Sequence, residues 1–320
     1  MLGYVLDTLV GDPRRGHPVA GFGRLATALE RRLYRPRLSA GAGHTALAVG
    51  LPVLVGAAVA AATRRRPLAR TVVVAAGTWA VLGGRTLRRE ATMMSRALRA
   101  DDLPAARHRL RSLCGRDPSR LDGPELARAT VESVAENTSD AVVAPLLWAA
   151  LAGLPGLLGY RAVNTLDAMV GHRSPRYARF GTPAARLDDL LNLLPSRLTG
   201  LLTIAAAPLA GGDRAEAWRI WRRDRHDHPS PNAGQCESAM AGALGVRLGG
   251  RNVYSGRVEV RPFLGDGPRP DAGHIDRAVR LSAVVGCAAL GIAATYAATG
   301  RFRRAVARRL RDRLAGQRRR

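Results

Sequence analysis

Long stretches without charged side chains recur along the chain and alternate with arginine-rich polar segments. Residues 45–63 ("TALAVGLPVLVGAAVAAAT") are long enough to cross a bilayer, which takes about 20 apolar residues. Residues 71–84 are shorter and would cross only marginally. Further uncharged stretches occupy residues 141–160, 198–212 and 281–300. The pattern predicts an all-α integral membrane protein with about four to five membrane-embedded helical segments, and the alternative is a soluble protein with buried alanine- and leucine-rich helices.

The stretch at 141–160 is interrupted in its middle by "GLPG" (153–156). Glycine and proline at this place would break a helix into two short arms. A single straight span would put Glu136 and Asn164 on opposite sides of the membrane, about 30 Å apart. Two arms that enter and return would leave both residues in one compartment, provided that protein buries the turn. We favour the re-entrant hairpin.

The polar segments between these stretches also have recognisable patterns. In residues 85–113, Leu and Met recur every three to four positions, which predicts an amphipathic helix. Residues 125–140 predict another helix, with "DGPE" as its start signal. Residues 252–263 ("NVYSGRVEVRPF") are the one plausible strand pair. We expect a single membrane-embedded catalytic domain over residues 1–300 and an arginine-rich tail over 301–320.

Composition favours a membrane protein over a nucleic-acid binder. The 320 residues carry a net charge of +25, yet all fifty basic residues are arginine and only 4% of the residues are aromatic. No basic patch alternates with stacking rings. The arginines gather beside apolar stretches, as in "RRRPLAR" (64–70) and in the tail, where they can also contact anionic lipid headgroups.

The orientation in the membrane follows less simply. If 45–63 and 71–84 form a hairpin, residues 1–44 and 85–140 lie on one side, and their arginines predict that this side is cytoplasmic. "RRRPLAR" would then lie outside, against the same rule.

Three widely spaced cysteines fit neither a zinc site nor a disulfide framework, which favours reduced thiols in cytosol-facing parts. The N-terminal "MLGYVLDTLVGDPRR" is a poor signal peptide, because its apolar run is short and contains Asp7.

Three carboxylates precede the apolar stretch at 141–160. Glu132, Glu136 and Asp140 are four residues apart and share one face of a helix. Like charges at this spacing repel unless a cation lies between them, and carboxylate-bound magnesium is one solution. Asn137 and Ser139 add further polar groups. The alternative is a solvated acidic helix face, but the adjacent apolar stretch favours a functional site.

Two later segments place acids on apolar helices. In "RAVNTLDAMVGHR" (161–173), Asn164 and Asp167 are three residues apart on one face, and an ionisable residue there is a site candidate. In "ARLDDLLNLLPSR" (185–197), Arg186, Asp189 and Asn192 fall on one side with Asp188 beside them. The alternative for this segment is a simple Arg186–Asp189 helix pair worth a few tenths of a kcal/mol.

Two loops complete the set of candidates. "LDTLVGDPRRGHPVAGFGR" (6–24) holds Asp12 and His17 among turn residues, where a lone histidine is more often structural. "RHDHPSPNAGQCESAMAGALG" (225–245) leads into a helix of small residues and can present backbone N–H groups to phosphate. Its polar candidates are His228, Ser230, Asn232 and Glu237. The chain has no lysine, so no Walker-type phosphate loop can form.

Five of these segments together resemble the CobD/CbiB family of cobalamin biosynthesis. They are "LVGDPRRGHPV", "ESVAENTSDAVVAPLLW", "NTLDAMVGHR", "RLDDLLNLLPSRLT" and "HPSPNAGQCESAMAGALGVRLGG", in the family's order from about residue 6 to 265. The resemblance implies an integral membrane enzyme, adenosylcobinamide-phosphate synthase. Such an enzyme joins the propionate carboxylate of adenosylcobyric acid to aminopropanol or its phosphate, with ATP and Mg²⁺. Relatives carry more apolar residues before the "GDP" motif, so a truncated first helix or a misassigned start is expected.

The resemblance also implies roles for the candidate residues. The predicted catalytic residues are Glu132, Glu136, Asn137, Asp140 and Asp167. Glu132, Glu136, Asp140 and Asp167 are expected to hold Mg²⁺ against phosphate oxygens, with Asp188 or Asp189 as further ligands, and one carboxylate could instead take a proton from the attacking amine. Arg24 and Arg186 are expected to grip phosphate or a corrinoid carboxylate. The remaining predicted substrate- or phosphate-binding residues are Asp12, His17, Asn164, Asp188, Asp189, His228, Ser230, Asn232 and Glu237.

Other functions stay open at this stage. A non-enzymatic membrane sensor similar to AmpE and a corrinoid transporter with acids at the midplane of the bilayer are the main alternatives. We expect a multi-pass protein of the cell (inner or plasma) membrane whose active site faces the cytoplasm. Its expected partners are the small-molecule corrinoid and amine substrates and membrane lipid, with other cobalamin-pathway membrane enzymes as further candidates and no nucleic acid.

Overall fold

A computed structural model describes residues 1–12, 16–172, 174–254 and 257–317. The helices on the N-terminal side are α1 (Leu2–Val10), α2 (Pro18–Leu33), α3 (Leu38–Ala62), α4 (Pro67–Val81), α5 (Gly84–Arg99), α6 (Leu103–Leu110) and α7 (Gly123–Thr138). They are followed by η1 (Ser139–Val143), α8 (Ala144–Leu166), η2 (Asp167–Gly171), α9 (Thr182–Ala206), η3 (Ala207–Ala210), α10 (Arg214–Asp224) and α11 (Ala233–Leu244). Strands β1 (Leu248–Tyr254) and β2 (Arg257–Leu264) precede the last helix, α12 (Ala272–Gln317).

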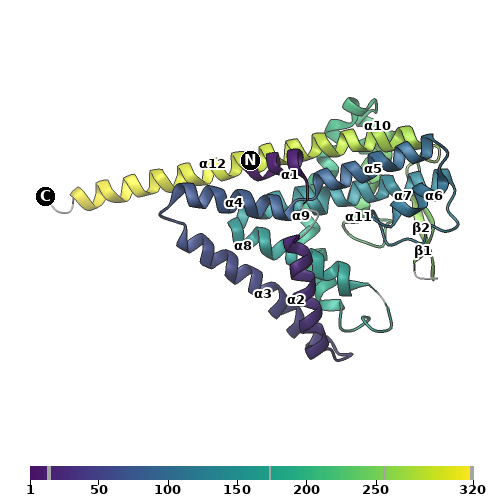
Figure 1. Cartoon of the computed structure of the whole chain (residues 1–320). Coiled ribbons are helices and arrows are strands. Elements are labelled where there is room, and N and C mark those ends of the chain that lie inside the picture. The colour runs from purple at the N-terminus through teal and green to yellow at the C-terminus, as the bar shows by residue number, and fades with distance from the viewer. Residues whose placement is uncertain (13–15, 173, 255–256, 318–320) are drawn as a thin grey trace.

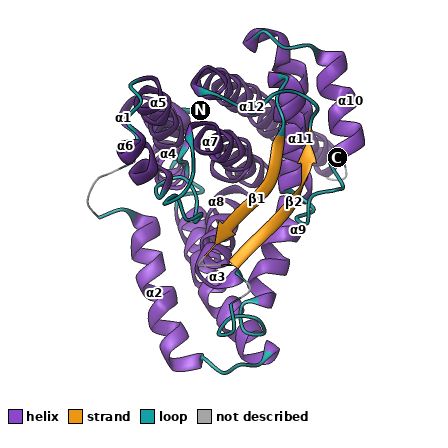
Figure 2. Cartoon of the chain, turned by 90° about the vertical axis from the view of Figure 1, so that its right-hand side faces the viewer, coloured by secondary structure: helices purple, strands orange, loops and turns teal. Residues whose placement is uncertain are grey.

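The helices are arranged along one long axis (Figure 1). α5 continues the direction of α4, and α12 runs beside α5 before its C-terminal part extends past the rest of the molecule. The strand pair lies at the opposite end, next to α7 and α11 (Figures 1 and 2). The apolar helices and the polar, strand-bearing part therefore occupy opposite ends of the molecule.

Five helical segments of the described chain are long and apolar enough to cross a membrane, which agrees with the predicted all-α membrane protein. They are Leu38–Ala62, Pro67–Arg99, Gly123–Gly171, Thr182–Ala210 and Ala272–Thr299. Two of the short predicted stretches belong to longer helical segments in the structure. The stretch at 71–84 is part of α4, which is followed after a two-residue break by α5, and the stretch at 198–212 is the end of a helix that begins at Thr182. The difference arises because charge-free windows miss the polar helical turns that precede or follow the apolar part.

The segment Gly123–Gly171 is a hairpin, as predicted from "GLPG". Gly153 has φ 67° and ψ −150°, a conformation that is essentially restricted to glycine. The chain reverses there, so that Asn164 on the second arm lies 3.4 Å from Asp140 on the first. Neither arm, residues 139–152 or 154–166, reaches the length of about 20 residues that spans a bilayer. Gly56 of α3 lies against the turn, since a methyl group there would be 3.0 Å from Pro155 Cα.

The polar elements follow local sequence signals. Asp122 and Glu125 form a reciprocal capping box at the start of α7, as the "DGPE" signal predicts. The predicted helix over 85–113 is instead two helices. Asp101 has φ 53° and Asp102 caps α6 by accepting a hydrogen bond from Ala105 N, so the chain turns between α5 and α6. The predicted strand pair is present, with Val253 opposite Val258 in an antiparallel ladder.

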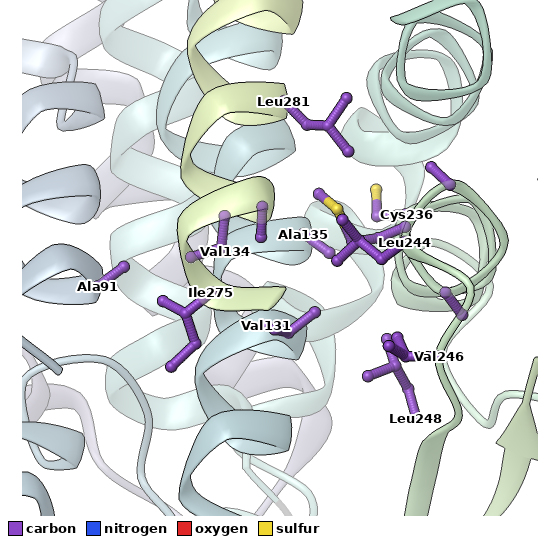
Figure 3. Packing of buried hydrophobic residues seen from close by; sticks show 14 of the residues in the cluster. Ala91, Val131, Val134, Ala135, Cys236, Leu244, Val246, Leu248, Ile275 and Leu281 are labelled. Carbon is purple, nitrogen blue, oxygen red and sulfur yellow. The ribbon is translucent and has the colours of Figure 1, made fainter. Parts of the chain in front are cut away.

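α7 lies at the centre of the largest apolar cluster. Val131, Val134 and Ala135 of α7 pack among residues of α5, α11 and α12, including Ala91, Leu244 and Ile275 (Figure 3). Because α7 is buried on nearly all sides, each charged group on it requires a partner within the protein. This burial determines what the carboxylates of α7 can do.

The C-terminal helix and the three cysteines lie outside the parts described so far. α12 continues as one helix through the predicted arginine-rich tail as far as Gln317, and residues 318–320 of that tail lie outside the described residues. Cys114, Cys236 and Cys287 are free thiols, which is consistent with the absence of a disulfide framework in the sequence pattern.

Candidate functional site

Glu132 is enclosed by positive groups on the buried face of α7. Its side chain is 2% exposed and forms ion pairs with Arg116 and Arg128. Its Oε1 also accepts a hydrogen bond of 2.7 Å from Gly249 N on β1. Arg128 in turn donates to Asn252 Oδ1 at 3.0 Å. Both oxygens of Glu132 are therefore used to join α7 to the loop before it and to the strand pair, and its role as a metal ligand stays a prediction.

Glu136 lies one turn further along α7 and meets a second glutamate. Glu136 is half-buried and its side chain contacts that of Glu237 on α11, with Arg116 and Arg261 close by. Glu237 is fully buried, and His228 Nε2 lies 3.7 Å from its Oε1. Desolvation by burial raises the pKa of Glu237 well above its usual value and lowers the pKa of His228 to about 4. Burial thus disfavours the charged form of both groups.

The helices that carry Asp140 and Asp167 contain short π-helical turns. Asp140 lies in η1 (Ser139–Val143) and Asp167 in η2 (Asp167–Gly171). Such turns are rare and occur often at functional sites. In η2 a side chain at Gly171 would collide with Asp167 Oδ1, at 1.8 Å from an added Cβ, so glycine makes room for the carboxylate. The backbone irregularity coincides with the two acids on either side of the hairpin.

Asp140 and Asp188 are joined through one amide, and we call Asp140, Asn164, Asp167 and Asp188 the aspartate cluster. Asn164 Nδ2 donates to Asp140 Oδ2 at 3.4 Å and to Asp188 Oδ1 at 3.3 Å. Asp167 interacts electrostatically with Asp188. The cluster thus combines the end of α7, both arms of the hairpin and α9.

Neighbouring polar groups fix the position of this cluster. Asn192 Nδ2 donates to Asp188 Oδ2 at 2.9 Å. The Tyr160 hydroxyl donates to Asn192 Oδ1 at 2.8 Å and lies 3.3 Å from the carbonyl oxygen of Asp140. These bonds tie α8, α9 and η1 together, so the carboxylates are held before any ligand arrives.

The aspartate cluster fits Mg²⁺ only as part of a larger complex. Within the described part of the chain, no three His, Cys, Asp or Glu side chains are arranged to hold a metal ion by themselves. Mg²⁺ usually binds through one or two carboxylates plus substrate phosphates and waters. Asp140 and Asp188, which share one amide donor, provide such a pair. The residues present therefore fit a magnesium ion that is completed by phosphate oxygens.

The loop before α11 is a structural clamp in this structure. Asn232 Nδ2 donates to the carbonyl oxygen of Asp189 at 2.8 Å, and Asn232 Oδ1 accepts from Ser196 at 3.0 Å. Ser230 Oγ accepts from the N–H groups of Asn232 and Ala233. The N–H groups of Asn232 and Ala233 are thus bound by the loop itself, and phosphate binding at the start of α11 stays a prediction.

The other predicted residues lie at the border of the site or on its supports. Asn137 donates to the carbonyl oxygen of Ser133 at 2.9 Å within α7. His17 accepts from Val19 N and so caps α2, and it lies 3.8 Å from Asp12 Oδ1. Arg24 and Arg186 are exposed, on α2 and α9 respectively. No contact between the exposed guanidinium groups and the aspartate cluster is observed among the described residues.

Several residues of the site were missed by the sequence analysis. Tyr160 is the last residue of the uncharged stretch at 141–160 and Arg161 directly follows it. Arg161 interacts electrostatically with Asp12 and Asp140. Arg116 and Arg261 come from segments without any motif, and each lies next to the glutamates. The one available signal was the position of Arg161 at the end of an apolar segment, where a charged side chain needs a partner.

A separate apolar crevice of about 1490 Å³ lies among α1, α3, α4, α8 and α12. Its walls are mainly alanine, leucine and valine, and no predicted site residue lines it. The crevice extends from Leu146 to the hairpin turn at Gly153 and also includes Arg64. Its apolar lining suits the interior of a bilayer, and we place the candidate site at the polar clusters instead.

Comparison with known proteins agrees with the motifs. The sequence profile of the family described as "CobD/Cbib protein" matches residues 1–282. The Cobalamin biosynthesis protein CobD of Mycobacterium tuberculosis (strain H37Rv) is 53% identical over 299 residues, covering 92% of this chain and 95% of that protein. The protein of the same name from Geobacter metallireducens is 49% identical over 271 residues, covering 83% and 85%.

A third relative named Cobalamin biosynthesis protein CobD, from Rhodobacter capsulatus, is 44% identical over 287 residues, covering 86% of this chain and 89% of that protein. No solved structure matches the chain. The profile covers most of the chain and the relatives cover nearly all of it at high identity. On these grounds, this chain belongs to the CobD/CbiB family of cobalamin biosynthesis proteins.

Proposed function

We propose that this protein forms an amide between the propionate carboxylate of adenosylcobyric acid and aminopropanol or its phosphate, using ATP and Mg²⁺. The observation that carries the proposal is that Asp140, Asn164 and Asp188 come together from three segments of the chain. Asp140 lies one helical turn after Glu136, so this cluster is close to Glu136. An amide ligase must activate a carboxylate and then remove a proton from an amine. The aspartate cluster and Glu136 provide groups for these two tasks side by side.

The residues of the cluster divide the work by their chemistry. When bound, Mg²⁺ would neutralise charge on the phosphate oxygens of the activated carboxylate. Asp140 and Asp188 would hold the ion, and Asn164, which bridges them, would keep their spacing. Tyr160 and Asn192 would orient the pair from behind. This arrangement would act mainly by holding the reactants in place. Such positioning can lower an activation barrier by up to about 7–11 kcal/mol.

Glu136 is the proposed general base. The attacking amine enters as an ammonium ion, and its nitrogen must lose a proton before it attacks the acyl carbon. The carboxylate of Glu136, which contacts the buried Glu237 and lies close to two arginines, is well placed to accept this proton. Before this attack the propionate carboxylate would take the terminal phosphoryl group of ATP, which releases ADP and gives an acyl phosphate. The amine nitrogen then bonds to the acyl carbon, the acyl–oxygen bond breaks and phosphate leaves. Arg24 and Arg186, exposed on α2 and α9, are proposed to contact the corrinoid's outer carboxylates or phosphate.

The membrane and side are also part of the proposal. We propose a multi-pass protein of the cell membrane with its site on the cytoplasmic side, because the site end carries many arginines, including Arg96 and Arg99 at the end of α5. The arginines at 64–66 lie at the other end of the membrane helices, so arginine positions alone support both orientations. A cysteine placed at Arg99 should react with a membrane-impermeant maleimide in inside-out vesicles and not in right-side-out vesicles.

The direct test is product analysis. Purified protein in detergent is incubated with adenosylcobyric acid, ATP, Mg²⁺ and either aminopropanol or aminopropanol phosphate. The mass of the product is measured by mass spectrometry. The expected result is a new amide that requires ATP, with no ATP-driven corrinoid flux in vesicles. Corrinoid binding without product under all conditions would instead favour a sensor, and flux without product a transporter.

A further inference from the structure

The apolar crevice among α1, α3, α4, α8 and α12 has no role in the proposed reaction. Its volume of about 1490 Å³ exceeds the roughly 300–1,000 Å³ of most small-molecule pockets. Its walls on α3, α4, α8 and α12 belong to segments that are long and apolar enough to cross a membrane. The crevice therefore lies within the bilayer, and its occupant must suit surroundings of lipid.

The re-entrant hairpin accounts for this unfilled space. Its first arm, residues 139–152, would be about 21 Å long at about 1.5 Å per residue, against about 30 Å of hydrocarbon in a bilayer. The crevice follows this arm to the turn at Gly153 and also reaches Arg64 and Arg70 at the connection between α3 and α4. Leu151 on its wall is 42% exposed, so the protein leaves part of this apolar surface uncovered.

The threonines that line the crevice use their hydroxyl protons within their own helices. Thr63, Thr71 and Thr78 each donate to the carbonyl oxygen four residues earlier, at 2.7, 2.9 and 2.7 Å. The other walls are mainly alanine, leucine and valine. An ordered water molecule needs roughly two to four polar partners, which such walls do not offer. The body of the crevice therefore favours a hydrocarbon chain over water.

The charge that borders the crevice is positive. Arg64 directly follows the end of α3 region and Arg70 lies in the first turn of α4, and both are exposed. No acidic residue lines the crevice within the described chain, and the sequence has no Asp or Glu between Glu30 and Glu90. These arginines also contradict the positive-inside rule if the aspartate cluster faces the cytoplasm. A phosphate group complements this charge and gives the arginines a reason to lie there.

We infer that the crevice binds one anionic phospholipid, with its phosphate at Arg64 and Arg70 and an acyl chain along the first arm of the hairpin. Arginine donors match phosphate oxygens, and the alanine and leucine walls match the chain. A water-soluble phosphate would leave the apolar walls unfilled. A lipid without net charge would leave the positive charge at the end of the crevice uncompensated.

Native mass spectrometry of the full chain in detergent tests this site. The delipidated protein is titrated with phosphatidylglycerol, with phosphatidylcholine that has the same acyl chains, and with glycerol phosphate. Wild-type protein should bind one phosphatidylglycerol more tightly than either other probe. Arg64→Gln combined with Arg70→Gln should weaken binding of phosphatidylglycerol by about 30-fold and leave phosphatidylcholine unchanged.

Matched variants separate this site from general attraction to a positive surface. Arg65→Gln combined with Arg66→Gln makes the same change in charge in the same connection, but these residues do not line the crevice, and the affinity should stay close to that of wild type. Ala57→Phe projects into the crevice from α3 and should weaken both lipids. Ala58→Phe, also exposed on α3 but outside the crevice, should weaken neither.

Three results would overturn the inference. Equal losses from the two arginine pairs would show attraction to any nearby positive charge. Equal affinity of the wild-type protein for the two lipids would show that the phosphate is not recognised by charge. Wild-type binding of both lipids by Ala57→Phe would place them outside the crevice.

Discussion

The side-chain amide of Asn164 lies 3.4 Å from the carboxylate of Asp140, although the two residues are 24 positions apart in the chain. A straight helix of this length would separate them by about 36 Å at a rise of about 1.5 Å per residue. Their contact depends on the reversal at Gly153. The hairpin therefore creates the site, since it brings acids from both of its ends to Asp188 of α9.

Replacement of Asn164 should lower activity by separating the two carboxylates that it bridges. Asn164→Ala removes both donors, and we expect a decrease of about 100-fold in kcat/KM, the usual cost of a misplaced catalytic group. Asn164→Asp has the same shape but adds a third negative charge between Asp140 and Asp188, so the loss should be larger. The measurement is ATP-dependent product formation at several Mg²⁺ concentrations. Wild-type activity in Asn164→Asp would show that the bridge has no role in the reaction.

Much of this architecture could be predicted from local patterns. The uncharged stretches predicted the membrane helices, "GLPG" predicted the hairpin, and "DGPE" predicted the start of α7. Each of these features depends on residues within a few turns of one another. The bounds were less accurate, because polar turns such as those at the start of α9 continue a helix without adding to its apolar signal.

The division of the acids between two clusters could not be predicted in this way. Helical spacing places Glu132, Glu136 and Asp140 on one face of a helix, but it does not say what that face meets. Arg116 and the strand pair enclose Glu132, while Asn164 from the returning arm meets Asp140. These partners come from distant segments without a shared motif, and only the tertiary structure separates the structural acid from the candidate catalytic ones.

Two neighbouring glutamates on α7 should therefore respond differently to the same change. Glu132→Gln leaves two buried arginines without their anion, and losing one partner of a buried ion pair costs about 3–5 kcal/mol. We expect a clear decrease in the thermal unfolding temperature in detergent. Glu136→Gln removes the proposed base from a half-buried position and should keep the unfolding temperature while lowering kcat by about 100- to 10,000-fold. A stable Glu132→Gln protein, or a fully active Glu136→Gln protein, would contradict this assignment.

The hairpin turn should depend on glycine at position 153. Gly153→Ala forces a Cβ onto φ 67° and ψ −150°, which costs about 1–3 kcal/mol. We expect lower thermal stability and a loss of activity, because the two arms would no longer align Asp140 with Asn164. Gly50→Ala on α3 is the matched control, since an added methyl group there contacts no other atom within 4 Å. That control should be neutral or stabilising by up to about 1 kcal/mol, and an equal loss in both variants would argue against a specific turn.

His228 should make the folded protein less stable as the pH falls below neutral. Burial lowers the pKa of His228 from 6.5 to about 4, so between these values the unfolded chain binds a proton that the folded chain does not. Stability then rises with pH across this window, by on the order of 3 kcal/mol in full. Replacement by asparagine, which can still accept a hydrogen bond from Ser230 N, should flatten the dependence of the unfolding temperature between pH 5 and 7. The same change at the exposed His108 of α6 should leave the slope as it is, and a slope that survives in His228→Asn would assign the pH dependence to another group.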